Sequence, residues 1–334
     1  MTTPRGTETA TDLAAATADL AALRAALGSV VLGQQTVIDQ LLCAVLAGGH
    51  VLLQGLPGLG KTQLVKALAR ALDVRMSRVQ CTPDLMPADV TGSEILTREH
   101  AAEALHFMPG PVFAQMVLVD EINRATPKTQ SALLEAMQEG QVTCNGRTHT
   151  LPEPFRVVAT QNPIEIEGTY PLPEAQLDRF AVRLDVDMPD RETLVAMLDV
   201  SLDAEPVETL APALTPERLQ LLLASARAPE IADSVKRAAA DLVLATHGGV
   251  ETPAAGLRYG ASPRGLQALL RCARVHALLE GRAHVAFRDL ETFALPCLNH
   301  RVVLSMDAVL GGADQATVLR ELLARWRARW YGDG

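Results

Sequence analysis

The stretch Gly55–Thr62, of sequence GLPGLGKT, constrains the fold of this chain more than any other. An apolar run, Val51–Leu53, precedes it, and a helical pattern from Gln63 to Leu72 follows. A strand, a glycine-rich loop and a helix in this order form a phosphate-binding loop, because the glycines let backbone N–H groups converge on an anion. The N-terminal end of the helix adds a partial positive charge. The stretch therefore predicts a nucleotide site on an α/β fold.

Within this loop the residue types indicate particular roles. Lys61 is predicted to place its ammonium group on the β- and γ-phosphates, and Thr62 to offer its hydroxyl to Mg²⁺. An ordinary glycine-rich turn with an incidental lysine is the alternative, but it would not require the flanking strand and helix. The predicted nucleotide-binding residues of the loop are Gly55, Pro57, Gly58, Leu59, Gly60, Lys61, Thr62 and Gln63.

A second apolar run, Met116–Val119, ends in two carboxylates, Asp120 and Glu121. In open α/β sheets, ligands lie at the carboxyl ends of the strands. Asp120 is therefore predicted to hold Mg²⁺ through water beside Thr62, and Glu121 to polarise a water molecule for attack on the γ-phosphate. Taken without the upstream loop, the pair would be an ordinary acidic turn after a strand.

Three further polar residues are weaker candidates on their own. Asn162 ends the next predicted strand, where its amide could hydrogen-bond the attacking water or the γ-phosphate, although Asn before Pro163 is also a common turn. Arg179 and Arg264 are single arginines, which are usually solvated surface charges. Composition and spacing do not select these two.

Composition limits the class of protein. The chain has 334 residues, enough for roughly two domains, and its net charge of −9 argues against broad electrostatic binding of nucleic acid. Its five cysteines contain no CxxC pair, which is typical of reduced thiols in a cytosolic protein. The first ten residues lack an apolar signal core, and the apolar run Leu41–Leu53 is too short to span a bilayer. We expect a cytoplasmic protein without a membrane span.

The hydrophobic pattern predicts an α/β fold, a parallel sheet flanked by helices, followed by a smaller all-α domain. We expect a flexible tail over residues 1–11 and a helix over Asp12–Leu27, which together form an N-terminal segment, 1–28. The α/β part covers 29–190 and carries two β-hairpins, at Gly92–Phe107 and Gln141–Leu151, the second with a turn at Asn145-Gly146. The helical part covers 205–334, with no convincing strand. Its predicted helices include Phe287–Leu304 and a final helix over Val309–Trp330.

The order of these motifs resembles that of the AAA+ ATPases, and the chain is similar to their MoxR family, in the helix-2-insert clade. The resemblance covers about residues 28–310 and leaves out the N-terminal tail and the last helix. The matching stretches are Gly55–Thr62, Thr82–Leu85, Pro109–Pro111, Asp120–Ala125, Lys128–Met137, Ala159–Pro163, Glu174–Phe180 and Ser262–Gly265.

The resemblance implies a role for each matched residue. Glu121 would be the catalytic carboxylate and Asn162 the sensor of the γ-phosphate. Arg179 would be an arginine finger that reaches the site of a neighbouring subunit, and Arg264 a second sensor on the helical lid, acting in cis or in trans. Gly33 and Gln34 would lie near adenine. The two hairpins match insertions that face the ring pore or the substrate in related proteins, although plain sheet-edge hairpins remain an alternative.

The resemblance also implies a function. We expect an ATPase that binds ATP and Mg²⁺ between the subunits of a hexameric ring and remodels or matures a client protein, with a partner that carries a von Willebrand factor A domain. A magnesium-chelatase-like motor subunit, a nucleic-acid motor and a non-hydrolysing nucleotide switch remain alternatives. The hairpin Gln141–Thr150 holds one Arg and one His, which is a poor electrostatic track for nucleic acid.

Overall fold

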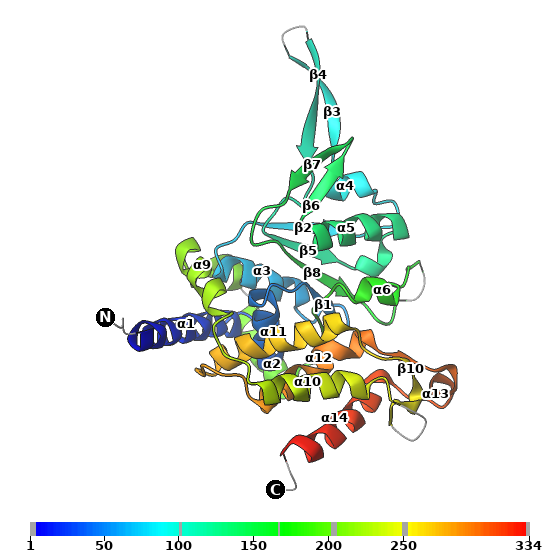
Figure 1. Cartoon of the computed structure of the whole chain (residues 1–334). Helices are drawn as coiled ribbons and strands as arrows, with labels where there is room; N and C mark the ends of the chain where they lie inside the picture. Colours follow the sequence, from blue (N-terminus) through cyan, green and yellow to red (C-terminus); the bar gives the residue numbers. More distant parts are fainter. Residues whose placement is uncertain (1–4, 100–101, 166–167, 202–205, 249–252, 332–334) are drawn as a thin grey trace.

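The computed structural model describes residues 5–99, 102–165, 168–201, 206–248 and 253–331. Figure 1 shows a sheet with helices on both faces, a layer of helices below it and a long hairpin that projects from the top. Within the described part of the chain, no helix is both long enough and apolar enough to cross a membrane.

Five parallel strands form the main sheet in the order β2-β5-β8-β1-β9. They are β1 (Val51–Gln54), β2 (Met76–Gln80), β5 (Met116–Asp120), β8 (Arg156–Gln161) and β9 (Val182–Asp185). Because all five run the same way, their carboxyl ends share one edge of the sheet. The phosphate loop follows β1, Asp120 ends β5 and Asn162 follows β8, all at that edge, and β8 lies between β5 and β1. The predicted parallel sheet is confirmed.

Alternate residues of the strands enter two separate hydrophobic clusters, as the two-residue period of a strand requires. Leu52, Val119 and Ala159 pack on one face, toward α5, whereas Leu53 and Leu118 pack on the other, toward α2 and α3.

The helices around the sheet are α2 (Gln35–Leu46), α3 (Lys61–Ala71), α4 (Pro87–Thr91), the 3₁₀ turn η1 (Ile122–Arg124), α5 (Pro127–Glu139) and α6 (Glu174–Leu177).

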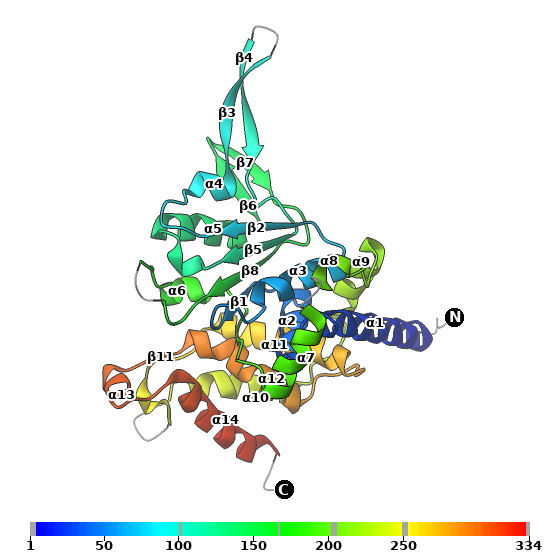
Figure 2. The same ribbon diagram turned by 180° about the vertical axis from the view of Figure 1, so that it is seen from behind.

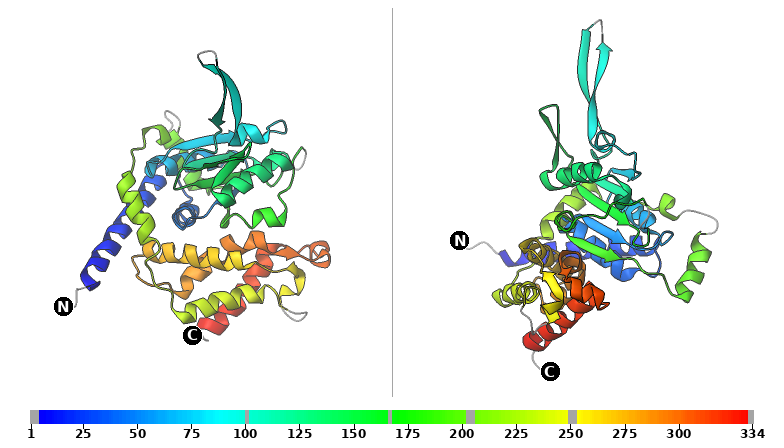
Figure 3. Two further views of the ribbon diagram at one scale, coloured as in Figure 1. Left: turned by 45° about the horizontal axis from the view of Figure 1, so that its top comes forward. Right: turned by 90° about the vertical axis from the view of Figure 1, so that its right-hand side faces the viewer.

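Both predicted hairpins are present beside α5. Their strands are β3 (Gly92–Glu99), β4 (Ala102–Pro109), β6 (Gln141–Cys144) and β7 (Arg147–Thr150). Asn145 and Gly146 both have positive φ, 47° and 78°, so the predicted two-residue turn is confirmed. The two hairpins contact each other: Phe107 stacks on His149 with ring centroids 3.8 Å apart, and Asn145 Nδ2 donates to Glu94 Oε2 at 2.8 Å. Figure 3 shows β3 and β4 projecting well beyond the sheet.

The rest of the chain is mainly helical. The helices α7 and α8 follow the sheet and lead to the C-terminal helical part, here called the lid. Helix α7 faces the viewer in Figure 2. The elements are α1 (Arg5–Gly28), α7 (Arg191–Ser201), α8 (Pro206–Thr209), α9 (Pro216–Ser225), α10 (Asp233–Ala245), η2 (Pro253–Gly256), β10 (Leu257–Tyr259), α11 (Pro263–Leu279), α12 (Phe287–Leu298), η3 (Asn299–Arg301), β11 (Val303–Leu304), α13 (Met306–Leu310) and α14 (Gln315–Tyr331).

Three of the expectations for these segments were wrong. The helix after Ala286 ends at Leu298, not Leu304, because His300 and Arg301 turn inward to bind backbone carbonyls near Phe180. The last helix is two helices, separated where Gly312 adopts a φ of 78°. The helical part also contains a short antiparallel pair, β10 with β11, whose strands are too short to leave an alternating pattern in the sequence.

The N-terminal helix also begins earlier than expected. Residues 5–11, predicted to belong to a flexible tail, are helical and continue the same helix to Gly28, while residues 1–4 lie outside the described chain. Extending a helix that is already formed fixes one residue for each new hydrogen bond and costs little. Leu20, Leu23 and Leu27 of α1 are fully buried, so tertiary packing holds the helix from which these residues extend.

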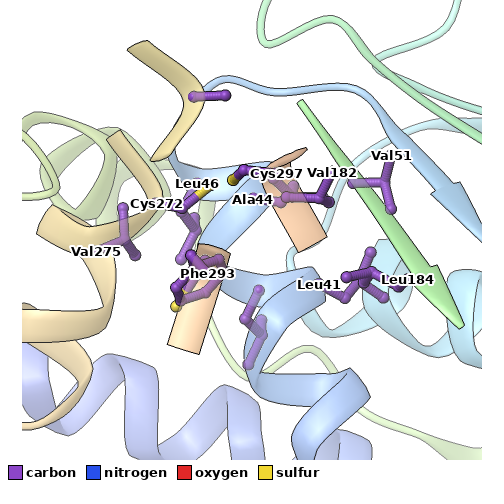
Figure 4. Packing of buried hydrophobic residues seen from close by; sticks show 14 of the residues in the cluster. Leu41, Ala44, Leu46, Val51, Val182, Leu184, Cys272, Val275, Phe293 and Cys297 are labelled. Atoms are coloured by element: carbon purple, nitrogen blue, oxygen red, sulfur yellow. The ribbon is translucent and has the colours of Figure 1, made fainter. Parts of the chain in front are cut away.

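The helical lid and the sheet share one hydrophobic core, with α2 between them. Figure 4 shows Leu41 of α2 beside Leu184 of the sheet, and Ala44 of α2 between Val182 of the sheet and Cys272 of the lid. All of these side chains belong to one cluster of buried residues that also includes α1 and α14. The core therefore does not stop at the boundary expected between residues 190 and 205.

His50, just before β1, has both ring nitrogens engaged by the backbone. Its Nε2 donates to Met137 O at 3.0 Å, and its Nδ1 accepts from Val157 N–H at 3.0 Å. Burial lowers the pKa of His50 from 6.5 to about 4, because a protonated ring would be poorly solvated and would lose the acceptor at Nδ1.

We predict that His50→Gln weakens the pH dependence of stability. As the pH falls from 6.5 toward 4, the unfolded chain takes up a proton that the folded ring refuses, so the free energy of unfolding falls, by about 3 kcal/mol over the full window. Urea unfolding at pH 7 and pH 5 measures this loss. The exposed His284→Gln variant is the control and should keep the wild-type slope. An unchanged slope in His50→Gln would contradict the assignment.

Candidate functional site

The phosphate loop depends on glycine at two positions because of backbone conformation. Gly58 and Gly60 have φ values of 81° and 76°, a region that residues with a Cβ rarely adopt, although a Cβ there would meet no other atom within 4 Å. Gly55 is required for a different reason, since a Cβ would lie 2.5 Å from Val186 O. The loop opens directly into α3 at Lys61, so the first N–H groups of that helix are available to an anion.

Lys61 currently bonds to its own loop. Its Nζ donates to Gly55 O at 2.8 Å and to Leu56 O at 2.6 Å. Burial lowers the pKa of Lys61, while the charges of Asp120 and Glu121 oppose that shift. A phosphate in the loop would offer the ammonium group a stronger acceptor than these two carbonyl oxygens.

Asp120 is buried at the end of β5 among donors from three strands or helices. Its Oδ2 accepts from Arg78 Nε at 2.7 Å, and its Oδ1 accepts from Thr160 Oγ1 at 3.2 Å. Thr62 Oγ1 lies 3.4 Å from the same Oδ1. A threonine hydroxyl and a carboxylate that face each other fit Mg²⁺, which binds few protein oxygens and keeps water and phosphate in its other positions. Thr62 and Asp120 are thus brought together as predicted.

Glu121 occupies an unusual backbone position that aims its side chain. Its φ is 56° and its ψ is 52°, the left-handed region, and its N–H donates to Thr160 Oγ1 at 2.9 Å. Its Oε2 accepts from Gln80 Nε2 and from Arg124 Nη1, each at 3.1 Å. The carboxylate is therefore held between β2 and η1 through its Oε2.

Asn162 and Gln34 complete the phosphate-loop side of the site. Asn162 is buried and uses its Oδ1 to accept from Ile164 N–H at 3.3 Å, which leaves its amide N–H₂ as the donor toward a γ-phosphate or water. Gln34 Nε2 donates to Leu59 O at 3.1 Å, while its buried Oε1 has no partner among the described residues. A buried acceptor next to the loop fits the amino group of adenine. Gly33, with a φ of 73°, packs against Thr193 of α7.

Arg179 and Arg264 lie elsewhere. Arg179 comes just before β9, at the amino edge of the sheet, whereas the phosphate loop follows the carboxyl end of the neighbouring β1. Arg179 and Arg264 line one cavity of about 240 Å³ with Arg271 and Gly48. With the residues that the structure describes, neither Arg179 nor Arg264 forms a side-chain hydrogen bond or ion pair. The chain does not bring these two arginines to its own phosphate loop.

Several residues of the site were not predicted from the sequence. Arg78 and Gln80 of β2 contact the two acidic residues, Thr160 connects them, and Arg124 binds Glu121. For Thr160 a signal existed, because it stands two residues before Asn162, on the neighbouring strand of the same sheet. For Arg78 and Gln80 none existed, since which strand pairs with β5 follows from the assembled sheet.

Known proteins match the chain along most of its length. Residues 50–182 match the family described as "ATPase family associated with various cellular activities (AAA)", and residues 253–322 match an AAA lid domain. Chaperone MoxR1 of Mycobacterium tuberculosis is 39% identical over 303 residues, 88% of this chain and 78% of that protein. Protein MoxR of Paracoccus denitrificans is 36% identical over 304 residues, 84% of this chain and 87% of that protein.

Two further matches extend over nearly the whole chain. Uncharacterized protein YeaC of Bacillus subtilis is 41% identical over 295 residues, which cover 88% of this chain and 90% of that protein. A crystal structure of a Cytophaga hutchinsonii protein superimposes with a TM-score of 0.86 at 35% sequence identity, covering 94% of this chain and 96% of the other. The arrangement of sheet and lid is therefore shared with a protein of known structure.

We predict that Gly60→Ala weakens nucleotide binding. An alanine at a φ of 76° costs about 1–2 kcal/mol, so the loop of the variant relaxes to another conformation when it is empty. Nucleotide binding must then restore the original conformation. That free-energy cost corresponds to roughly a 5- to 30-fold higher Kd. Gly146→Ala is the matched control, because Gly146 has a φ of 78° and equal space but lies in the β6–β7 turn. Titration with a fluorescent ATP analogue measures both, and equal losses in the two variants would refute the prediction.

Proposed function

Because the chain belongs to the MoxR family of AAA+ ATPases, we propose that it hydrolyses Mg-ATP at the subunit interfaces of a hexameric ring and uses the energy to remodel a client protein. That it is an ATPase follows from the family. The metal ion, the ring, the client and the residue roles belong to the proposal.

The observation that carries the proposal is that the residues expected of one active site lie at opposite edges of the sheet. The phosphate loop, Asp120 and Glu121 lie at the carboxyl edge of the sheet, whereas Arg179 and Arg264 lie at the amino edge, with no side-chain partner in the part of the chain that the structure describes. Phosphoryl transfer usually requires positively charged groups beside the transferred phosphoryl group, because its oxygens carry negative charge. A second copy of the chain that presents its amino edge to the first copy's phosphate loop supplies them.

In this arrangement each residue of the loop edge has a defined task. Lys61 leaves the carbonyls of Gly55 and Leu56 for the β- and γ-phosphates, and Thr62 and Asp120 would hold a magnesium ion. The chemistry that such an ion would supply is neutralisation of charge on the phosphate oxygens. Glu121 orients and polarises the attacking water, and Asn162 donates its amide N–H to that water or to the γ-phosphate.

The arginine edge has its own tasks. Arg179 and Arg264 share one cavity, so we assign both to the triphosphate of the neighbouring subunit, Arg264 in trans rather than in cis. Hydrolysis at each site then depends on two chains. An arginine supplied by a neighbouring subunit raises the rate of hydrolysis about 10³- to 10⁵-fold.

The hairpins give the proposal a surface for a client. Leu96 and Leu105 are paired across β3 and β4, and they are 60% and 55% exposed. Ile95 and Met108 are also exposed, on the opposite face of this projecting hairpin. Exposed apolar side chains of this kind suit the exposed apolar segments of an incompletely folded protein. One relative is named a chaperone, and a partner with a von Willebrand factor A domain is part of the same proposal.

The alternatives have less support. For a nucleic-acid motor the hairpin β6–β7 offers Arg147, but its His149 is stacked on Phe107. A magnesium-chelatase-like role would make the activity depend on a tetrapyrrole substrate, and no feature of the described site supports that role. A non-hydrolysing switch would not require Glu121 at the end of β5. The proposal places the ring in the cytoplasm, where buried thiols such as Cys43 stay reduced.

We predict that Arg179→Ala binds ATP as the wild type does but loses about 10³-fold in turnover, because its own phosphate loop is intact. The rate per subunit of the wild type should rise with protein concentration. Mixing Arg179→Ala with Glu121→Gln should restore turnover, since each supplies what the other lacks. Steady-state hydrolysis at saturating ATP measures this, and full activity of Arg179→Ala alone would remove the assignment.

We also predict that replacing both Leu96 and Leu105 by serine leaves the basal ATPase rate unchanged but abolishes client binding. The readout is suppression of aggregation of a chemically denatured reporter protein, with and without ATP. Met306→Ser is the control, because Met306 is 73% exposed on α13, far along the chain from the hairpin. Retained suppression in the doubly substituted protein would show that the hairpin is not the contact surface.

A further inference from the structure

Arg301, at the end of η3, is an almost fully buried arginine whose guanidinium binds the segment that carries Arg179. Its side chain is 2% exposed. Its Nε donates to Asp178 Oδ1 at 2.8 Å, and its Nη2 donates to Asp178 O at 3.1 Å and to Phe180 O at 2.7 Å. Its Nη1 donates to Ala181 O at 3.0 Å and to Cys297 O at 2.5 Å. All but the last of these acceptors lie within residues 178–181.

The same network reaches the segment that carries Arg264. Asp178 Oδ1 also accepts from Ser262 Oγ at 2.8 Å, and Ser262 is the residue before α11, two positions before Arg264. Gly265 follows Arg264, and a Cβ there would lie 2.9 Å from Arg301 Cδ. The first turn of α11 therefore packs on the aliphatic part of Arg301 while its guanidinium holds residues 178–181.

One buried side chain thus touches both segments that contain Arg179 and Arg264, two arginines that have no side-chain hydrogen bond or ion pair with the described residues. Asp178 is adjacent to Arg179 in the chain, and Ser262 and Gly265 flank Arg264. A hydrophobic side chain could fill the same volume, but it could not bind four acceptors of one loop. Arginine presents five N–H donors in a fixed plane, which suits an array of carbonyl oxygens and one carboxylate.

We propose that Arg301 is a positioning residue that fixes Arg179 and Arg264 relative to each other, so that both reach the triphosphate of the neighbouring subunit together. This inference rests on the proposed function, in which those two arginines act in trans. Loss of Arg301 would leave the chain's own phosphate loop intact and would lower turnover at the neighbour's site, since a shift of about 1 Å in a reacting group can cost 10²-fold in rate.

The test uses subunit mixing, which separates the two edges of the chain. Glu121→Gln subunits keep both arginines and should restore turnover when mixed with Arg179→Ala subunits. Glu121→Gln subunits that also carry Arg301→Met should restore about 100-fold less. As a single variant, Arg301→Met should lower kcat while the KM for ATP stays within about twofold of wild type.

Arg282→Met is the matched control. Arg282 is also a largely buried lid arginine in an ion pair, with Nη1 2.8 Å from Asp289 Oδ2, but it does not contact residues 178–181. Glu121→Gln subunits carrying Arg282→Met should restore as much turnover as Glu121→Gln subunits without it. Thermal unfolding of both variants shows whether they lose similar stability. If Arg301→Met does not fold, Ser262→Ala removes a single hydrogen bond of the network and should still lower restoration several-fold.

The outcomes distinguish the two claims. If Glu121→Gln alone restores turnover and the Arg301→Met version restores it equally well, the positioning role is overturned while the trans arginines stand. An equal loss with Arg282→Met would likewise overturn it, because general weakening of the lid would then explain the effect. If Glu121→Gln alone restores nothing, the proposed function fails, and this inference fails with it.

Discussion

The hydrogen bonds between five parallel strands decide which polar groups of this chain can meet. Because β1, β5 and β8 are neighbours with the same direction, the residues that follow them converge at one edge of the sheet. The segment before β9 is confined to the opposite edge by the same pairing. Every other feature of the site depends on this division, from the Thr62–Asp120 contact to the isolation of Arg179 and Arg264.

Much of the loop edge was predictable from the sequence because its signals are local. The phosphate loop, the acidic pair and Asn162 each stand directly after a recognisable apolar run, and parallel strands bring such positions together. The turn at Asn145-Gly146 was predictable for the same reason, since two residues with positive φ nearly define it. The roles of Arg179 and Arg264 came only from family resemblance, as single arginines carry no local pattern.

The remaining features depend on contacts between distant parts of the chain. Gln80 binds Glu121 across 41 positions, and Arg301 binds Asp178 across 123. Helix α12 ends at Leu298 because His300 and Arg301 turn inward, and the spacing of apolar residues in the sequence does not predict that turn. The strands β10 and β11 are stabilised by each other and have too few residues for a periodic pattern. These are effects of the assembled fold.

The core shared by α2, the sheet and the lid has a mechanical consequence. Swinging the lid away from the sheet would expose side chains such as Phe293, Leu41 and Cys272 to water, at about 25 cal/mol for each Å² of apolar surface. Within one chain, the two layers therefore behave as a single stiff lever. In the proposed ring, strain from a bound nucleotide would then pass to the contacts between subunits.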